Sequence, residues 1–205
     1  MIAGLSVFVV AILRMQSGFA TDRAFPVPVY MVMHIPLPHD SYVQAAAVLQ
    51  HADPGDGEAT IAVAEADAHA SVPASRLIPR IKFGLQKSPT SARGWTLLAE
   101  QYLAMGRRQS AVQAISTALL LSPFDYWIAG RRARVAAVLF GDLDPDTRFS
   151  AVRQAELLWD APGLRSQIPV LLRTPGGGRL MLQALGDDPR NLRALNRWLA
   201  ADRRR

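Results

Sequence analysis

The feature that most constrains the fold of this chain is the spacing of large and small residues between positions 95 and 123. Trp95, Leu98 and Tyr102 follow one another at intervals of three and four residues, which places them on one face of an α-helix. Gly106 interrupts this pattern, and a second helical run follows it. The stretch therefore predicts two helices joined by a short turn.

Small residues occupy the positions where two such helices would touch. Alanine stands at 99 and 111, where the helix backbones would meet, and at 118, which would face a following unit. A larger side chain at such a contact costs about 1–3 kcal/mol through overpacking. We expect six side chains to be mostly buried in one helical hairpin, namely Trp95, Leu98, Tyr102, Ala111, Ile115 and Ala118.

Prolines close three successive units of similar length. Pro54, Pro89 and Pro123 are separated by 35 and 34 residues, a period typical of helical repeat proteins. The chain resembles a tetratricopeptide repeat (TPR) strongly over residues 92–123 and weakly over 41–91. The residues that carry this resemblance are Trp95, Leu98, Ala99, Tyr102, Gly106, Ala111, Ile115, Ala118 and Pro123. The sequence departs from the family at position 99, where glycine is commoner than alanine.

The repeat pattern and the resemblance predict an all-α fold. The expected architecture is a short TPR-like α-solenoid with an irregular helical C-terminal cap and an extended N-terminal arm. We expect a signal peptide or membrane anchor at residues 1–20 and an extended proline-rich arm at 21–40. The repeats are expected at 41–123 and the cap at 124–205. The arm contains four prolines between 25 and 40, which forbid a helix there.

Two Asp–Pro pairs mark helix starts within the cap. Asp144–Pro145 and Asp188–Pro189 each place an N-cap acid before a proline at the first helical position. The helix before the first pair is expected to present as its apolar side Trp127, Ile128, Val135, Val138 and Leu139. The helix after that pair carries as its large apolar residues Phe149, Val152, Leu157 and Trp159.

The N-terminus begins with an apolar run of 13 residues, MIAGLSVFVVAIL, followed by Arg14. This length is typical of a signal-peptide core, and the small residues at 18 and 20 suit a cleavage site. No basic residue precedes the run, which is also shorter than a bilayer span of about 20 residues. We expect a membrane-anchored or periplasmic protein; the alternative is a buried first helix in a cytoplasmic protein.

The charge of the chain is positive and concentrated toward its C-terminus. The net charge is +6, and the region from Phe124 onward holds 14 arginines against 9 acids. This excess indicates contact with an anionic surface through the C-terminal arginines, or a solvated basic surface. Aromatic residues are not interleaved with the arginines, so no specific nucleic-acid partner is expected. The chain has no cysteine, which excludes disulfides and thiolate chemistry.

No motif for catalysis, cofactor binding or metal binding is recognisable. The four histidines lack the spacing of a helical metal pair, and neither a nucleophile motif nor a P-loop is present. The sequence TPGGGR at 174–179 could cradle a phosphate with its amides, although glycine runs are primarily turn signals. We therefore predict no catalytic residues, no cofactor and no metal.

The function expected from these features is that of a non-catalytic protein–protein interaction scaffold. By analogy with small envelope repeat proteins, its partner would be a protein of an envelope or membrane complex in secretion or polysaccharide assembly. The Lys/Asn/Arg clamp with which the family binds peptide C-termini is not recognisable. The alternative is an accessory or divergent enzyme acting on an anionic glycan or lipid. Candidate contact residues are Arg93, Thr96, Glu100, Gln101, Arg131, Arg132 and Arg134.

Overall fold

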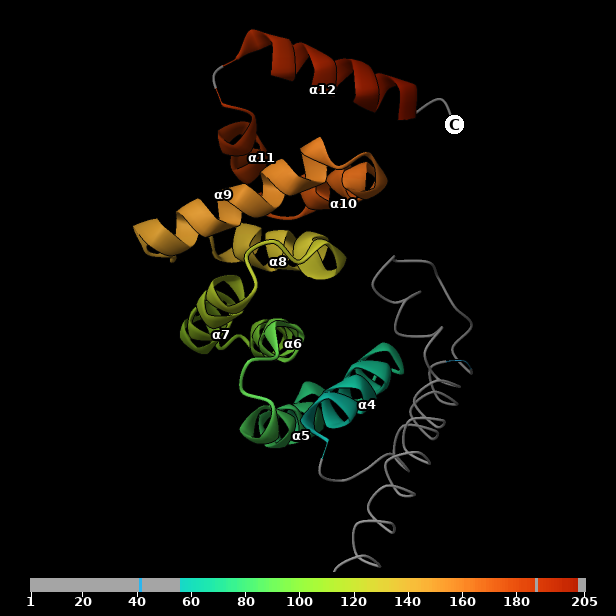
Figure 1. The fold of residues 1–205 in the computed structure, drawn as a ribbon, viewed down its shortest axis with the longest axis vertical. Coiled ribbons are helices and arrows are strands. Elements are labelled where there is room, and N and C mark those ends of the chain that lie inside the picture. Colours follow the sequence, from blue (N-terminus) through green and yellow to red (C-terminus); the bar gives the residue numbers. More distant parts are fainter. Residues whose placement is uncertain (1–40, 42–55, 187, 203–205) are drawn as a thin grey trace, which may run out of the picture. The chain divides into compact units, whose positions relative to one another are not determined.

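The computed structural model describes residues 41, 56–186 and 188–202 of the chain. Within these residues the secondary structure consists of α-helices and one short 3-10 helix, without any strand (Figure 1). The prediction of an all-α fold is confirmed. The expected signal or anchor and the proline-rich arm lie outside the described residues. Among the helices that are described, none is long and apolar enough to cross a membrane.

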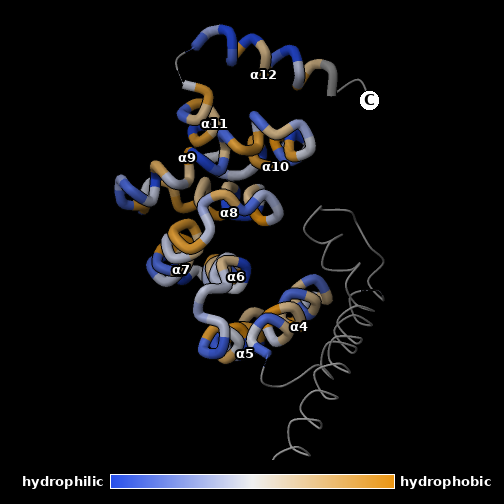
Figure 2. Tube along the Cα trace, in the orientation of Figure 1, coloured by the Kyte–Doolittle hydropathy of each residue, from blue (hydrophilic) through white to orange (hydrophobic). Residues whose placement is uncertain are grey.

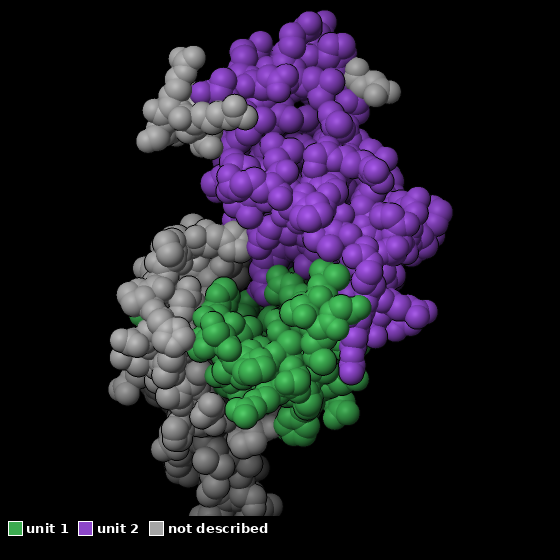
Figure 3. All heavy atoms as spheres, turned by 180° about the vertical axis from the view of Figure 1, so that it is seen from behind, with its two compact units in different colours: residues 1–106 green, residues 107–205 purple. Residues whose placement is uncertain are grey.

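The chain divides into two compact units after Gly106 (Figure 3). The described part of the first unit contains the helices α4 (Gly57–His69), α5 (Ala74–Lys87) and α6 (Ala92–Ala104). Each of these helices packs against the other two. Their shared core consists of aliphatic side chains that are at most 5 % exposed, including Ile61, Leu77, Ile81, Leu85, Leu97 and Leu98.

Glycines allow the helices of the first unit to approach closely. A Cβ atom added to Gly84 on α5 would lie 2.8 Å from the Cγ1 atom of Ile61 on α4. A Cβ atom added to Gly94 on α6 would lie 2.7 Å from the Cδ1 atom of the same isoleucine. Both positions therefore leave room for Ile61, which is fully buried.

The second unit is built around α8 (Tyr126–Leu139), which packs against four of its neighbours. Those neighbours are α7 (Arg108–Leu121), α9 (Pro145–Asp160), α10 (Ile168–Arg173) and α11 (Gly177–Leu185). The 3-10 helix η1 (Pro162–Gln167) connects α9 to α10, and α12 (Pro189–Asp202) follows α11. Alanines on α8 provide the space for these contacts, because four of them are at most 2 % exposed, namely Ala129, Ala133, Ala136 and Ala137.

The predicted helix ends agree with the structure where they depend on local chemistry. The break expected near Gly106 lies between α6 and α7. Helices α5 and α7 each end one residue before a Ser–Pro pair, at Ser88–Pro89 and Ser122–Pro123. Both serines lie outside the helical region, with ψ of 69° at Ser88 and 72° at Ser122. A residue before proline is disfavoured in the helical region, which explains these ends.

Five of the six side chains predicted to pack are buried; their packing in one helical hairpin stays a prediction, because α6 and α7 belong to different units. Leu98, Tyr102 and Ile115 are at most 8 % exposed, and the alanines at 111 and 118 are fully buried. Trp95 is half-buried, and its indole N–H donates to the carbonyl of Pro89 at 2.8 Å. The predicted burial of Trp95 is therefore met in part.

One residue of the predicted apolar side of α8 and one large apolar residue of α9 are exposed. Trp127 is 62 % exposed and Phe149 is 68 % exposed. The buried positions of α9 instead lie on one helix face, namely Thr147, Ala151, Gln154, Ala155 and Leu158. Two of these residues are alanines, because close helix packing requires small residues where the backbones approach.

The glycine run at 176–178 forms a tight turn that packs against α8 and α10. Gly176 has a φ of +79°, and an added Cβ atom would lie 2.1 Å from the carbonyl oxygen of Ala137. The amide of Gly177 donates to the carbonyl of Thr174 at 2.9 Å. This hydrogen bond closes the turn. The close approach to Ala137 and the turn therefore explain the glycines, and no phosphate site is needed to explain them.

Asp144 caps α9 as the Asp–Pro pair predicts. Its Oδ1 atom accepts the backbone N–H of Thr147 at 2.9 Å, and its Oδ2 atom accepts the hydroxyl of Thr147 at 2.6 Å. These bonds favour the ionised carboxylate and lower the pKa of Asp144 below 3.8. Its contribution to stability is therefore present above pH 3.8 and is lost as the pH falls through the lowered folded-state pKa.

We expect Asp144→Asn to weaken the acid sensitivity of the protein. Asparagine keeps an oxygen that can accept the Thr147 amide, but it does not titrate. The urea midpoint should fall less between pH 5 and pH 2.5 in the variant than in the wild type. Asp146→Asn, which removes a charge from the same turn without removing a cap, is the control. Equal acid sensitivity in Asp144→Asn and the wild type would contradict this role.

Candidate interaction site

The candidate contact residues of the first unit lie on α6, and one of them is buried. Thr96 is fully buried, and its hydroxyl donates to the carbonyl of Ala92 at 2.8 Å. It cannot touch a partner, so its prediction as a contact residue is wrong. Glu100 and Gln101 are half-buried, which leaves part of each side chain at the surface.

Arg93 is bound to a buried acid on α4. Its Nε atom donates to the Oε2 atom of Glu65 at 2.5 Å, and the carboxylate of Glu65 is fully buried. A buried carboxylate without a cation is costly, so Arg93 stabilises the contact between α4 and α6. Only 23 % of the Arg93 side chain is exposed for contact with a partner. The sequence signal for this pair was a glutamate flanked by two alanines, Ala64 and Ala66, in an apolar stretch.

Arg132 on α8 is fully buried and binds backbone carbonyls at the end of α7 and in the loop between α7 and α8. Its Nη1 atom donates to the carbonyls of Ala118, at 3.4 Å, and Ser122, while Nη2 donates to the carbonyl of Asp125 at 3.0 Å. Desolvation lowers the pKa of Arg132 to about 10, although the charge of Asp125 opposes this shift. Its prediction as a contact residue is wrong, because the guanidinium is enclosed and serves as a cap.

Of the remaining two arginines of α8, Arg131 lies in the interior of the second unit and Arg134 lies at its edge. Arg131 is 6 % exposed. Arg134 is half-buried and donates from Nη1 to the Oε1 atom of Gln167 at 3.1 Å. Gly130 leaves room for this glutamine, since an added Cβ atom would lie 2.7 Å from the same oxygen. The three arginines therefore form no open cluster that would favour the enzyme alternative.

Sequence reasoning missed an apolar surface at the junction of α7 and α8. Five of the eight residues from 120 to 127 are large, apolar and exposed by 39–75 %, namely Leu120, Leu121, Phe124, Tyr126 and Trp127. We call these five residues the α7–α8 apolar segment. Single exposed apolar residues are common, whereas such a concentration marks an interaction surface. The signal in the sequence was the aromatic-rich stretch LLSPFDYW, of which only Trp127 was expected on an apolar helix side.

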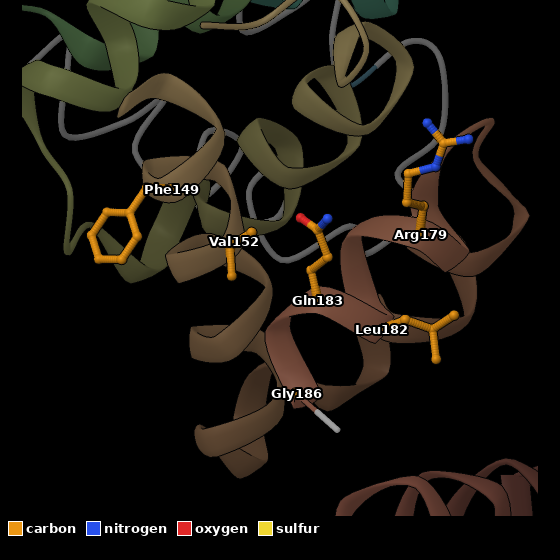
Figure 4. A pocket seen from close by; sticks show the side chains of 6 residues that line it. All are labelled: Phe149, Val152, Arg179, Leu182, Gln183 and Gly186. Atoms are coloured by element: carbon orange, nitrogen blue, oxygen red, sulfur yellow. The ribbon is translucent and has the colours of Figure 1, made fainter. Parts of the chain in front are cut away.

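A second exposed feature is an open groove between α9 and α11 (Figure 4). Side chains from both helices line it, namely Phe149, Val152, Arg179, Leu182 and Gln183, together with Gly186. Phe149 and Leu182 are more than half exposed. The groove could accept an apolar side chain. It joins residues some 30 positions apart, which periodicity within one helix could not predict.

Within residues 56–186 and 188–202, no three His, Asp or Glu side chains gather as metal ligands would. His69, at the end of α4, is exposed, and the other three histidines lie outside the described residues. Comparisons with protein-family models, with curated proteins and with solved structures found no match.

Proposed function

We propose that this protein is a non-catalytic scaffold that binds another protein through the α7–α8 apolar segment. The observation that carries this proposal is the exposure of Phe124, Tyr126 and Trp127 within four consecutive residues. Tyr and Trp are enriched among the residues that dominate binding energy at interfaces. Burying them against a partner would remove a large apolar area from water.

The surface of α6 around Arg93, Glu100 and Gln101 is retained as a second, weaker contact. These side chains are partly exposed, but Arg93 already pairs with Glu65. A half-buried polar side chain contributes less to binding than an exposed aromatic one that becomes fully desolvated. The α7–α8 apolar segment is thus the principal contact in this proposal.

The apolar run at residues 1–13 supports a place for the scaffold at the cell envelope. The proposed partner is accordingly a protein of an envelope or membrane complex, and secretion and polysaccharide assembly are the processes that we propose it supports. This placement rests on the sequence and on analogy.

We expect the double substitution Phe124→Ala and Trp127→Ala to weaken partner binding at least about thirtyfold, as loss of one or two hot spots does. The partner would first be captured by crosslinking in native membranes, then purified for affinity measurements against each variant. Because both side chains are exposed, the variant should keep the thermal stability of the wild type.

Phe149→Ala is the matched control, because Phe149 is an equally exposed phenylalanine in the same unit. It should leave the affinity unchanged. An equal loss in the control would reject the α7–α8 apolar segment as the contact. Loss of binding in Glu100→Ala with Gln101→Ala alone would move the contact to α6. Turnover of a purified glycan or lipid that depends on Arg134 would overturn the scaffold function.

A further inference from the structure

Helix α12 has one apolar face and one arginine face. Leu195 is 7 % exposed, and Leu192, Trp198 and Leu199 are half-buried, so these residues form the inner face. The exposed positions follow at intervals of three and four residues and include Arg190, Arg193 and Arg197. Figure 2 shows hydrophilic and hydrophobic segments alternating along this helix. The outer face is therefore a continuous basic stripe, which we call the α12 arginine face.

The three arginines of this face have no ionic partner among the described residues. No salt bridge or side-chain hydrogen bond involves them, and no acidic residue occupies the exposed positions between them. The carboxylate of Asp188 accepts the backbone N–H of Arg190, at the start of the helix. The segment 189–205 holds six arginines against Asp202, a net charge of +5 that nearly equals the +6 of the whole chain.

The α12 arginine face has the spacing of a surface contact. Arg190 and Arg197 are seven residues apart, or about 10 Å along the helix. A stripe of guanidinium groups on a straight helix suits a flat array of phosphates. No aromatic side chain lies on the exposed face to stack with bases, since Trp198 lies on the inner face.

The geometry points to the α12 arginine face as a binding surface for anionic lipid headgroups. Each basic residue near an anionic bilayer strengthens binding about fivefold. Binding by this face is electrostatic and falls as the salt concentration rises. It does not depend on the proposed protein contact at the α7–α8 apolar segment, which lies on other helices.

The test measures co-sedimentation of the full chain with two kinds of vesicle, phosphatidylglycerol mixed with phosphatidylcholine, and phosphatidylcholine alone. Insertion by the N-terminal apolar run would add binding to both kinds, so the readout is the difference between them. The wild type should prefer anionic vesicles, and 0.5 M salt should abolish that preference. The triple variant Arg190→Gln, Arg193→Gln and Arg197→Gln should lose about a hundredfold in this preference.

The matched control replaces three other exposed arginines with glutamine, namely Arg76, Arg107 and Arg173. It has the same net charge as the first triple variant, and it should keep most of the preference for anionic vesicles. An equal loss in the two triple variants would overturn the proposal, because net charge alone would then explain binding. Tighter binding to duplex DNA than to vesicles, lost in the α12 variant, would assign the face to nucleic acid instead. Failure of the partner-binding experiment leaves this result unaffected.

Discussion

Replacing Gly177 with alanine should destabilise the second unit by about 3 kcal/mol or more, the upper end of the cost of overpacking. A Cβ atom at this position would lie 1.8 Å from the carbonyl oxygen of Leu171 and 2.7 Å from its carbonyl carbon. Both obstacles are backbone atoms of α10, so no side-chain rotation can relieve the clash. The α10–α11 turn would have to move, and fully buried residues on both helices, Leu171 and Leu180, would lose packing.

Gly178→Ala is a control one residue away in the same turn. An added Cβ atom at Gly178 would meet nothing within 4 Å. Because alanine favours a helix over glycine, this variant should be as stable as the wild type or up to about 1 kcal/mol more stable. Urea unfolding followed by circular dichroism measures both changes. Similar midpoints for the two variants would show that the turn does not pack against α10 as described.

Features set by neighbouring residues in the sequence were predictable. The Ser–Pro helix ends at Pro89 and Pro123 and the Asp144 cap follow from sterics and hydrogen bonding within a few residues. The burial of Leu98 and Ile115 also followed from periodicity, because each lies in the middle of an apolar stripe.

Features set by contacts between distant residues were not predictable from one sequence. Thr96 lies between apolar positions on α6, and its burial depends on which side of the helix its neighbours cover. Trp127 was assigned to the core because it is large and apolar. On α8 the alanines occupy the close contacts, and Trp127 remains outside them. A prediction from hydrophobicity alone therefore placed Trp127 in the core, although it belongs to the candidate interaction surface.

Arg132 is the clearest case of a residue whose role the sequence concealed. A basic residue near Arg131 and Arg134 suggested a charged surface. The structure instead places its guanidinium against carbonyls at the end of α7 and in the loop that follows it. The helix needs this partner because its last carbonyls have no intrahelical donor, and Pro123 contributes no N–H.

Replacing Arg132 with alanine should destabilise the second unit by about 2–5 kcal/mol, the cost of truncating a large buried side chain. The carbonyls of Ser122 and Asp125 would lose their donor, and a cavity would replace a fully buried side chain. Arg132→Lys should recover part of the loss, because an ammonium group can reach fewer carbonyls than the guanidinium fork. The urea midpoint measures each variant.

The exposed Arg153, which pairs with Glu156 within α9, supplies the control. Arg153→Ala should change stability by about 0.5 kcal/mol or less, since pairs of this kind on a helix surface are weak. Equal losses from Arg132→Ala and Arg153→Ala would show that the guanidinium of Arg132 is not enclosed at the end of α7.

The burial of Arg132 also predicts the sign of a pH effect. Its folded-state pKa of about 10 lies below the ordinary value of 12.5, so the unfolded chain binds the proton more strongly between these pH values. The free energy of unfolding contributed by Arg132 therefore rises with pH above about 10. Below that pH the buried group carries its charge, and the full cost of desolvating that charge lowers the stability. The difference in unfolding free energy between the wild type and Arg132→Ala should widen from pH 9 to pH 11. Other groups titrate in both proteins and cancel from the difference, so a constant gap would mean that the charge of Arg132 remains hydrated in the folded protein.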